Sequence, residues 1–83
     1  MRLDKYLKVS RIIKRRTVAN EACDADRITI NGKQSKPSKE VKVGDVIGIR
    51  FGDKDVFFKV TKVPVGNVSK SDAQDLYESI IDA

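Results

Sequence analysis

The chain has 83 residues, 40% hydrophobic and 35% charged, which fits one small domain with a single modest core. Its 17 Lys/Arg against 12 Asp/Glu give a net charge of +5, and it contains one cysteine and no histidine. These counts exclude an internal disulfide and a zinc site of the Cys/His kind. They also disfavour general acid–base catalysis, because histidine is the side chain that titrates unaided near neutral pH. We therefore expect neither enzyme activity nor a bound metal or cofactor.

Location and partner class follow from the distribution of apolar and charged residues. No apolar run approaches the ~20 residues of a membrane span, and no signal peptide is visible, so we expect a cytoplasmic protein. Residues 1–39 hold 11 Lys/Arg and 4 Asp/Glu, a net of +7, whereas residues 40–83 hold 6 and 8, a net of −2. A polyanion should therefore meet the N-terminal half. Nucleic acid is favoured over a membrane surface, which usually requires a basic amphipathic helix with exposed bulky apolar residues.

Two short helices are predicted at the N-terminus. The first covers Arg2 to about Val9, where Leu3, Tyr6 and Leu7 recur at three- and four-residue spacing and form one apolar stripe. The second covers about Thr17 to Asp24 with Thr17 as its N-cap, and small residues on one face allow close packing.

The period then changes to two, which predicts a sheet. Arg27–Ile30 alternates polar and apolar residues and is followed by Asn31-Gly32, a strong signal for a tight hairpin turn. Gly44-Asp45 is interpreted as a structural turn. Further strands are predicted at Val41–Val43, Val46–Phe51 and Val56–Val63.

The C-terminal part is predicted to be a linker over 64–69 followed by an amphipathic helix. Apolar residues there recur at the i, i+3, i+4, i+7, i+8 positions of a helix, and Phe57 is expected to pack beneath that helix. The expected fold is α+β, with two N-terminal helices on a small, mostly antiparallel sheet and a C-terminal helix. Residues 1–65 would form the binding domain, and 66–83 the linker and helix packed on it. The apolar positions of this predicted helix are Ala73, Leu76, Tyr77, Ile80 and Ile81.

A basic cluster lies between the two predicted helices. Arg15 and Arg16 directly precede the second helix, whose N-terminus already disfavours cations. Such a break of a local rule is expected at a functional site. Arginines beside exposed backbone N–H groups form a phosphate site, and Arg2 repeats the arrangement at the first helix. The predicted RNA-binding residues are Arg2, Lys5, Lys8, Arg11, Lys14, Arg15, Arg16 and Lys33.

Two other residues have structural explanations. Asp4 lies in the first turn of its helix, where it suits the dipole and can pair with Lys8 one turn later. Cys23 falls on an apolar face and, without a histidine partner, is interpreted as a core residue.

These residues together resemble a known family, the S4 RNA-binding domain, which is named after a small-subunit ribosomal protein. The resemblance covers about residues 1–50 and implies that the two helices and the following strand-loop bind structured RNA. One departure is Ala25-Asp26, where the family often has glycine before the first strand. The matching segments are Arg2-Leu3-Asp4-Lys5-Tyr6-Leu7, Arg15-Arg16-Thr17 with Ala19, Arg27-Ile28-Thr29-Ile30-Asn31-Gly32 and Val43-Gly44-Asp45.

Within that family the chain resembles two groups of small ribosome-associated proteins, the fifteen-kilodalton heat-shock type and the quality-control type of Gram-positive bacteria. The predicted strand at 56–63 and the acidic C-terminal segment are more similar to the second group. This resemblance implies contacts with large-subunit rRNA and peptidyl-site tRNA on stalled large ribosomal subunits. It also implies work beside a factor that recruits alanyl-tRNA for alanine tailing. Arg2 and Arg16 match the RNA-contacting arginines of that group.

Four alternatives remain at the level of sequence. One is a heat-shock-type rescue or ribosome-assembly factor. Another is a DNA-binding helix-turn-helix protein, although Asn20, Glu21 and Asp24 suit a base-reading helix poorly. The others are a protein-interaction module that uses the acidic C-terminal helix, and an RNA-modifying enzyme, which the absence of histidine disfavours.

Overall fold

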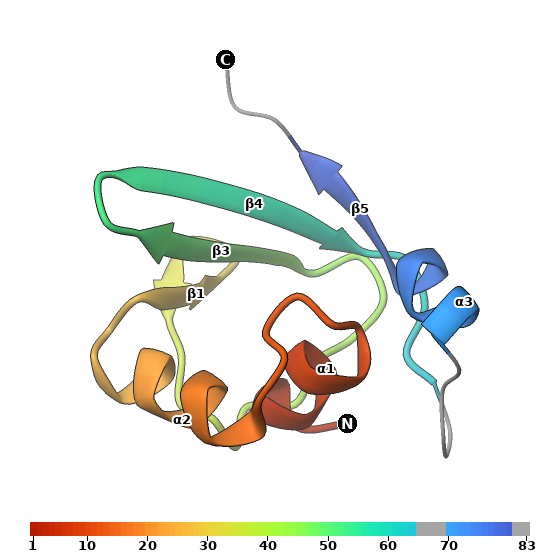
Figure 1. Cartoon of the computed structure of the whole chain (residues 1–83). Helices are drawn as coiled ribbons and strands as arrows, with labels where there is room; N and C mark the ends of the chain where they lie inside the picture. Colours follow the sequence, from red (N-terminus) through yellow and green to blue (C-terminus); the bar gives the residue numbers. More distant parts are fainter. Residues whose placement is uncertain (65–69, 81–83) are drawn as a thin grey trace.

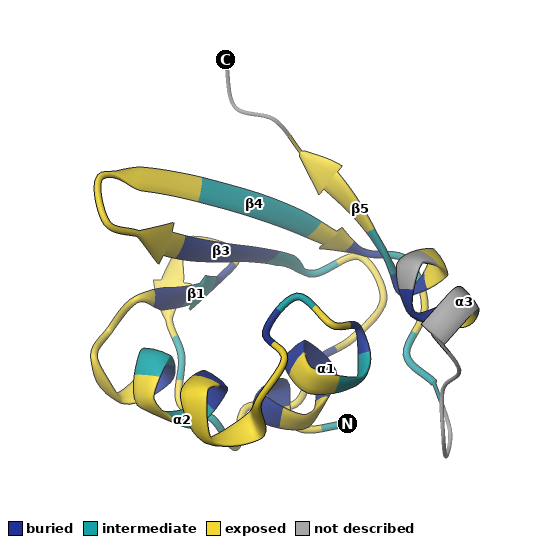
Figure 2. Ribbon diagram, in the orientation of Figure 1, coloured by how far each residue is buried: buried dark blue, intermediate teal, exposed yellow. Residues whose placement is uncertain are grey.

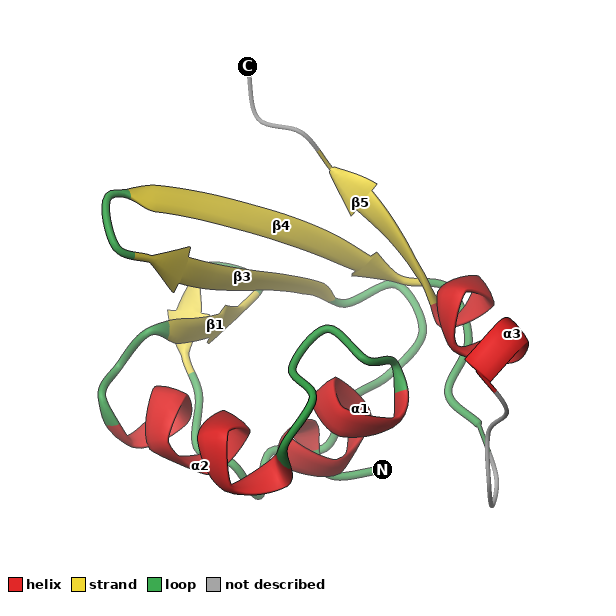
Figure 3. Ribbon diagram, in the orientation of Figure 1, coloured by secondary structure: helices red, strands yellow, loops and turns green. Residues whose placement is uncertain are grey.

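The computed structural model describes residues 1–64 and 70–80, and its centre is a five-stranded antiparallel sheet in the order β2-β1-β3-β4-β5. Figure 1 shows α1 and α2 against one face of this sheet, with α3 at one end, and Figure 3 separates helices from strands by colour. The expected α+β fold with two N-terminal helices is confirmed, and every strand pairing is antiparallel. The elements are α1 (Leu3–Val9), α2 (Arg16–Asp24), β1 (Ile28–Ile30), β2 (Lys33–Gln34), β3 (Val46–Phe51), β4 (Lys54–Val60), α3 (Lys70–Ala73), the 3₁₀ helix η1 (Gln74–Leu76) and β5 (Tyr77–Ile80).

The core lies between the two helices and the lower face of the sheet (Figure 2). The predicted stripe of Leu3, Tyr6 and Leu7 is fully buried, because it faces the isoleucines of β1 and β3. Helix α2 contributes the small side chains Ala19 and Cys23, both buried as expected. The N-terminal helices are therefore held against the sheet by apolar burial, which leaves their polar faces outward.

The Asn31-Gly32 turn joins β1 to β2 as the sequence predicts. Both residues have positive φ, 53° and 84°, and Ile30 pairs with Lys33 across the turn. This is the backbone geometry that favours Asn-Gly in two-residue hairpins. The Asn31 side chain also accepts a hydrogen bond from the Val46 N–H at 3.0 Å, so the turn is fixed to the start of β3.

Helix α2 starts at Arg16, one residue earlier than the sequence suggests. Its N-cap is Arg15, with extended backbone and no side-chain capping hydrogen bond, so the prediction of Thr17 as N-cap is wrong. The helix ends in a Schellman motif, in which Arg27 N–H donates to the Ala22 carbonyl and Asp26 N–H to that of Cys23. Asp26 has φ +59°, the left-handed conformation in which glycine is usual. The departure from family glycine therefore leaves the turn geometry intact.

The predicted strand at 41–43 is also wrong. These residues form a connection from β2 to β3, in which Val41 is buried and donates its N–H to the Met1 carbonyl at 2.9 Å. Val43 is 64% exposed, so the apolar alternation of this segment does not correspond to a sheet face. Val41 serves instead to anchor the loop beside the start of α1, where Arg2 forms an isolated bridge with Glu40.

The C-terminal amphipathic helix is not formed. A single turn, α3, and η1 bury Ala73 and Leu76, after which Tyr77–Ile80 leaves the helical path and pairs with β4. Without β5, the outer edge of β4 would present unpaired backbone groups, so sheet hydrogen bonds outweigh a short helical pattern. Strand β4 also ends at Val60 rather than Val63. The predicted linker residues 65–69 and residues 81–83 lie outside the described residues.

One hydrogen bond joins the C-terminal segment to the first helix. The Tyr6 hydroxyl is buried and donates to the Leu76 carbonyl at 2.6 Å, and the same carbonyl accepts the N–H groups of Thr61 and Lys62. Burial and the nearby Tyr77 raise the pKa of Tyr6, so its hydroxyl stays protonated and remains a donor. This hydrogen bond fixes the C-terminal segment to α1.

Candidate nucleic-acid interface

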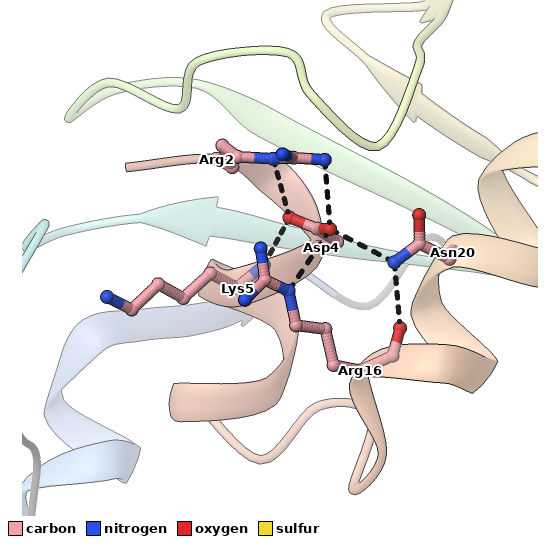
Figure 4. A network of polar contacts seen from close by, with 5 residues as sticks. All are labelled: Arg2, Asp4, Lys5, Arg16 and Asn20. Atoms are coloured by element: carbon pink, nitrogen blue, oxygen red, sulfur yellow. Dashed lines mark hydrogen bonds and ion pairs between the residues drawn. The ribbon is translucent and has the colours of Figure 1, made fainter.

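A buried carboxylate between α1 and α2 organises the two arginines that the sequence analysis singled out (Figure 4). Asp4 is 1% exposed, and its Oδ1 accepts the Lys5 N–H at 2.8 Å and lies 3.3 Å from Arg2 Nε. Its Oδ2 accepts hydrogen bonds from Arg16 Nε at 3.2 Å, Asn20 Nδ2 at 3.0 Å and Arg2 Nη2 at 3.3 Å. Residues 12 positions apart in sequence are thus brought to one carboxylate. The expected pairing of Asp4 with Lys8 is replaced by these contacts, because Arg16 approaches from a second helix.

The charge balance of this cluster is positive. Burial alone would raise the pKa of Asp4, but hydrogen bonds from Arg16, Asn20 and the Lys5 N–H, together with the charge of Arg16, hold its pKa below 3.8. Asp4 is therefore ionised at neutral pH and carries one negative charge between two guanidinium groups. The cluster keeps a net positive charge after this internal pairing.

Both arginines remain accessible on the surface. Their side chains are 54% exposed for Arg2 and 45% for Arg16. Arg16 uses only its Nε on Asp4, and within residues 1–64 and 70–80 its two terminal NH₂ groups have no protein partner. A guanidinium held by one edge and open at the other leaves planar donors free, a geometry that suits a phosphate ligand.

The side chains of the remaining helix-side candidates make no hydrogen bond or ion pair with Asp4 among the described residues. Figure 4 shows the Lys5 side chain extending away from the Asp4 carboxylate. Arg11 has a φ of +62° just after α1. Two of these cations lie on α1 and the other three on the loop between α1 and α2. The exposed ones are Lys5, Lys8, Arg11, Lys14 and Arg15.

Lys33 lies apart, on β2, where it lines a groove of about 610 Å³. Three further lysines of the following loop line the same groove, and none of them is among the RNA-binding residues predicted from the sequence. Glu40, which bridges to Arg2, is also part of its wall, so the groove adjoins the Asp4 cluster. The four lysines are Lys33, Lys36, Lys39 and Lys42.

The described residues give little support for a reactive thiol, a metal site or a membrane span. Cys23 is buried, and burial followed by the charges of Asp4 and Asp24 raises the pKa of its thiol to about 11, which leaves it unreactive. Among the described residues, no group of three His, Cys, Asp or Glu is arranged to hold a metal ion. No helix in the described ranges is long and apolar enough to cross a membrane.

Comparison with known proteins places these features in a family. The model of the S4 domain matches residues 1–47, the segment that holds both helices, the Asp4 cluster and Lys33. The chain is 54% identical over 80 residues to the RQC P-site tRNA stabilizing factor of Streptococcus pneumoniae, covering 96% of this chain and 90% of that one. It is also 54% identical to the protein of the same name from Halalkalibacterium halodurans, covering 94% and 88%.

A solved structure agrees with the fold. The trimeric heat shock protein 15 of Vibrio cholerae superposes with a TM-score of 0.85 at 31% sequence identity, covering 96% of this chain and 81% of that one. The S4 resemblance predicted from the N-terminal motifs is therefore confirmed over residues 1–47, and the similarity to the relatives extends over nearly the whole chain.

Proposed function

Because this chain belongs to the S4 domain family, we propose that it is a non-catalytic RNA-binding protein of the large ribosomal subunit. The observation that carries the proposal is the pair of half-exposed arginines, Arg2 and Arg16, held side by side on the buried Asp4. Two prepositioned guanidinium groups suit two phosphate oxygens of a folded RNA. Holding them in advance reduces the side-chain entropy that RNA binding would otherwise cost.

The lysine groove supports a longer RNA contact. The groove adjoins Arg2 through Glu40, so a phosphate backbone gripped at the arginines can continue along Lys33, Lys39 and their neighbours. Lysine suits this role because it acts as a point charge without strict geometry. Phosphate contacts carry no sequence information, so we propose that the shape of the RNA selects the binding site.

The names of the similar proteins support a more specific role on the ribosome. Proteins at 54% identity are named RQC P-site tRNA stabilizing factor, which supports a role at P-site tRNA in ribosome-associated quality control. We propose that the protein contacts large-subunit rRNA and peptidyl-site tRNA on stalled large subunits in the cytoplasm. There it would work beside an alanyl-tRNA-recruiting factor during alanine tailing. The similarity to heat shock protein 15 favours a second candidate, a rescue or assembly factor that binds the same subunit.

The helix-turn-helix alternative loses support at Asn20. Its amide donates to Asp4 and to the Arg16 carbonyl at 3.2 Å, so it is engaged inside the protein and is not presented to a base edge. Helix α2 therefore offers an arginine-holding face in place of a recognition face.

The decisive experiment measures co-sedimentation of Arg16→Ala with large ribosomal subunits. Loss of a charge-assisted phosphate contact should weaken binding about 10- to 100-fold. Arg16→Lys should recover part of the loss, because it keeps the charge and loses the planar fork. The control is Lys62→Ala, which removes one exposed cation beyond β4 and should bind normally.

A thermal melt of each variant accompanies the binding assay. Because the Arg16 side chain is 45% exposed, its removal should cost at most about 1 kcal/mol of stability. Normal binding by Arg16→Ala would contradict the proposal, and so would weak binding that comes with a collapse of the fold. Recovery of peptidyl-tRNA with the tagged protein from lysate would favour the quality-control role over assembly.

A further inference from the structure

The face of the sheet opposite α1 and α2 carries a recess that the basic helix surface does not use. Figure 1 shows this upper face of β3 and β4 without a described helix above it. The recess has a volume of about 280 Å³, with Thr29, Gly48 and Phe57 among its lining residues and Arg27 and Arg50 beside them. The sequence predicts a C-terminal helix over Phe57, and the absence of that helix among residues 70–80 leaves this ring on the open face.

The floor of the recess depends on one glycine. Thr29, Gly48, Phe57 and Ile80 are successive partners across β1, β3, β4 and β5 and therefore share one face of the sheet. A Cβ on Gly48 would lie 3.0 Å from Phe57 Cε1 and 2.6 Å from Thr29 Oγ1. The missing side chain thus allows the Phe57 ring to lie over β3, where it is half-buried and partly open to solvent.

The rim of the recess carries two arginines, Arg27 and Arg50, together with the carboxylates of Asp26 and Asp55. Arg27 is exposed and directly precedes β1, and its carbonyl accepts the Arg50 N–H at 2.9 Å, so the two arginines are neighbours. The Arg50 side chain is 67% exposed and donates to Asp55 at 3.3 Å through Nε alone. The rim therefore presents guanidinium donors beside an aromatic ring and the Thr29 hydroxyl.

We propose that this recess binds one unpaired nucleotide of RNA, with its base stacked on Phe57 and its phosphate beside Arg27 and Arg50. Base stacking on an aromatic side chain tolerates any base, and arginine supplies the phosphate contact. A second copy of the chain fits this face less well. A stable interface buries about 800 Å² per partner, whereas the exposed apolar groups here are few and ringed by charge. The inference rests on the proposed RNA-binding function and adds a second, single-stranded site to it.

The chain contains no tryptophan, so a substituted tryptophan provides a probe without background. Phe57→Trp should fold normally and show quenched fluorescence when a short single-stranded oligoadenylate is added at low salt. The matched control is Phe51→Trp, at a position 51% exposed on β3 and outside the recess, whose fluorescence should change little. Equal quenching of the two variants, or none in Phe57→Trp, would overturn the proposal.

Affinity provides the second measurement, by fluorescence anisotropy of the labelled oligoadenylate. Phe57→Leu should weaken binding about 5- to 100-fold, and Phe51→Leu should leave it unchanged. Arg27→Ala should also weaken it, which tests the phosphate contact separately from the ring. Oligoadenylate affinity that is equal in Phe57→Leu and the parent protein would refute the stacked base. If the protein instead self-associates in sedimentation and Phe57→Leu abolishes this, a second copy occupies the face and the proposal is wrong.

The two sites are separable by cross-testing. Arg16→Ala should lose large subunits and retain the quenching of Phe57→Trp when the two changes are combined, because the recess lies on the other face of the sheet. Quenching with normal subunit binding by Arg16→Ala would overturn the proposed helix surface and support the recess. Loss of subunit binding by Arg16→Ala, together with no quenching in Phe57→Trp, would support the helix surface and overturn the recess.

Discussion

Replacement of Asp4 by asparagine separates charge from geometry at the helix surface. The change raises the net charge of the chain from +5 to +6, so simple attraction to a polyanion predicts tighter RNA binding. One added unit of charge about 7 Å from a phosphate in water gives about 0.6 kcal/mol, or roughly threefold in affinity. If Asp4 instead positions the two arginines, its replacement should weaken RNA binding.

The size of the positioning effect follows from the contacts of Asp4. Asparagine can retain the Lys5 N–H contact through one oxygen, but its NH₂ group would meet the donors of Arg16 and Asn20, now at 3.2 and 3.0 Å from Oδ2. A hydrogen bond to a charged group contributes about 1.5–3 kcal/mol. The half-exposed arginines regain water, so we expect a stability loss of about 1–2 kcal/mol and about tenfold weaker binding.

The assay is filter binding of Asp4→Asn to large-subunit rRNA at fixed salt, together with a thermal melt. A loss of 1–2 kcal/mol should lower the Tm by about 4–16 °C for a domain of this size. Asp4→Asn that stays folded at the assay temperature and binds RNA as tightly as the parent protein, or more tightly, would refute the role of Asp4 as a positioning residue.

Four further outcomes are expected. The pKa of Asp4 is lower in the folded chain than its unfolded value of 3.8. Its stabilising contribution should therefore be complete above about pH 5 and lost as pH falls through the folded pKa. The free energies of unfolding of the parent protein and Asp4→Asn, measured by urea titration, should converge in acid. If four to six phosphates are contacted, a plot of log affinity against log salt should have a slope of roughly −3 to −5, and a flat plot from filter binding would contradict an electrostatic grip. Asp26→Gly should raise the free energy of unfolding by about 0.5–1 kcal/mol, since glycine adopts the φ of +59° without strain. Gly48→Ala should lower the free energy of unfolding by about 1–3 kcal/mol, because the added Cβ would contact Thr29. A urea midpoint that does not change in either variant would contradict the corresponding prediction.

Local periodicity determined much of the fold before any tertiary contact was considered. The stripe of Leu3, Tyr6 and Leu7 could be recognised because helix geometry repeats every 3.6 residues, and the Asn31-Gly32 turn because few residues tolerate its positive φ. Arg2 and Arg16 stood out because cations are disfavoured near helix N-termini. Each of these signals lies within a few residues, so no knowledge of the remaining chain was needed.

Tertiary structure decided which groups meet. The pairing of Asp4 with Arg16 depends on how α1 packs against α2, and no local spacing encodes it. Tyr77–Ile80 satisfies a helical pattern, yet the unpaired edge of β4 converts it to a strand, because backbone hydrogen bonding across a sheet is a nonlocal demand. The same change leaves Phe57 on an open face. The sequence by itself thus determined the N-terminal helices, the hairpin turn and the basic composition of the surface, whereas the C-terminal strand and the arrangement of charges and rings into sites required the folded chain.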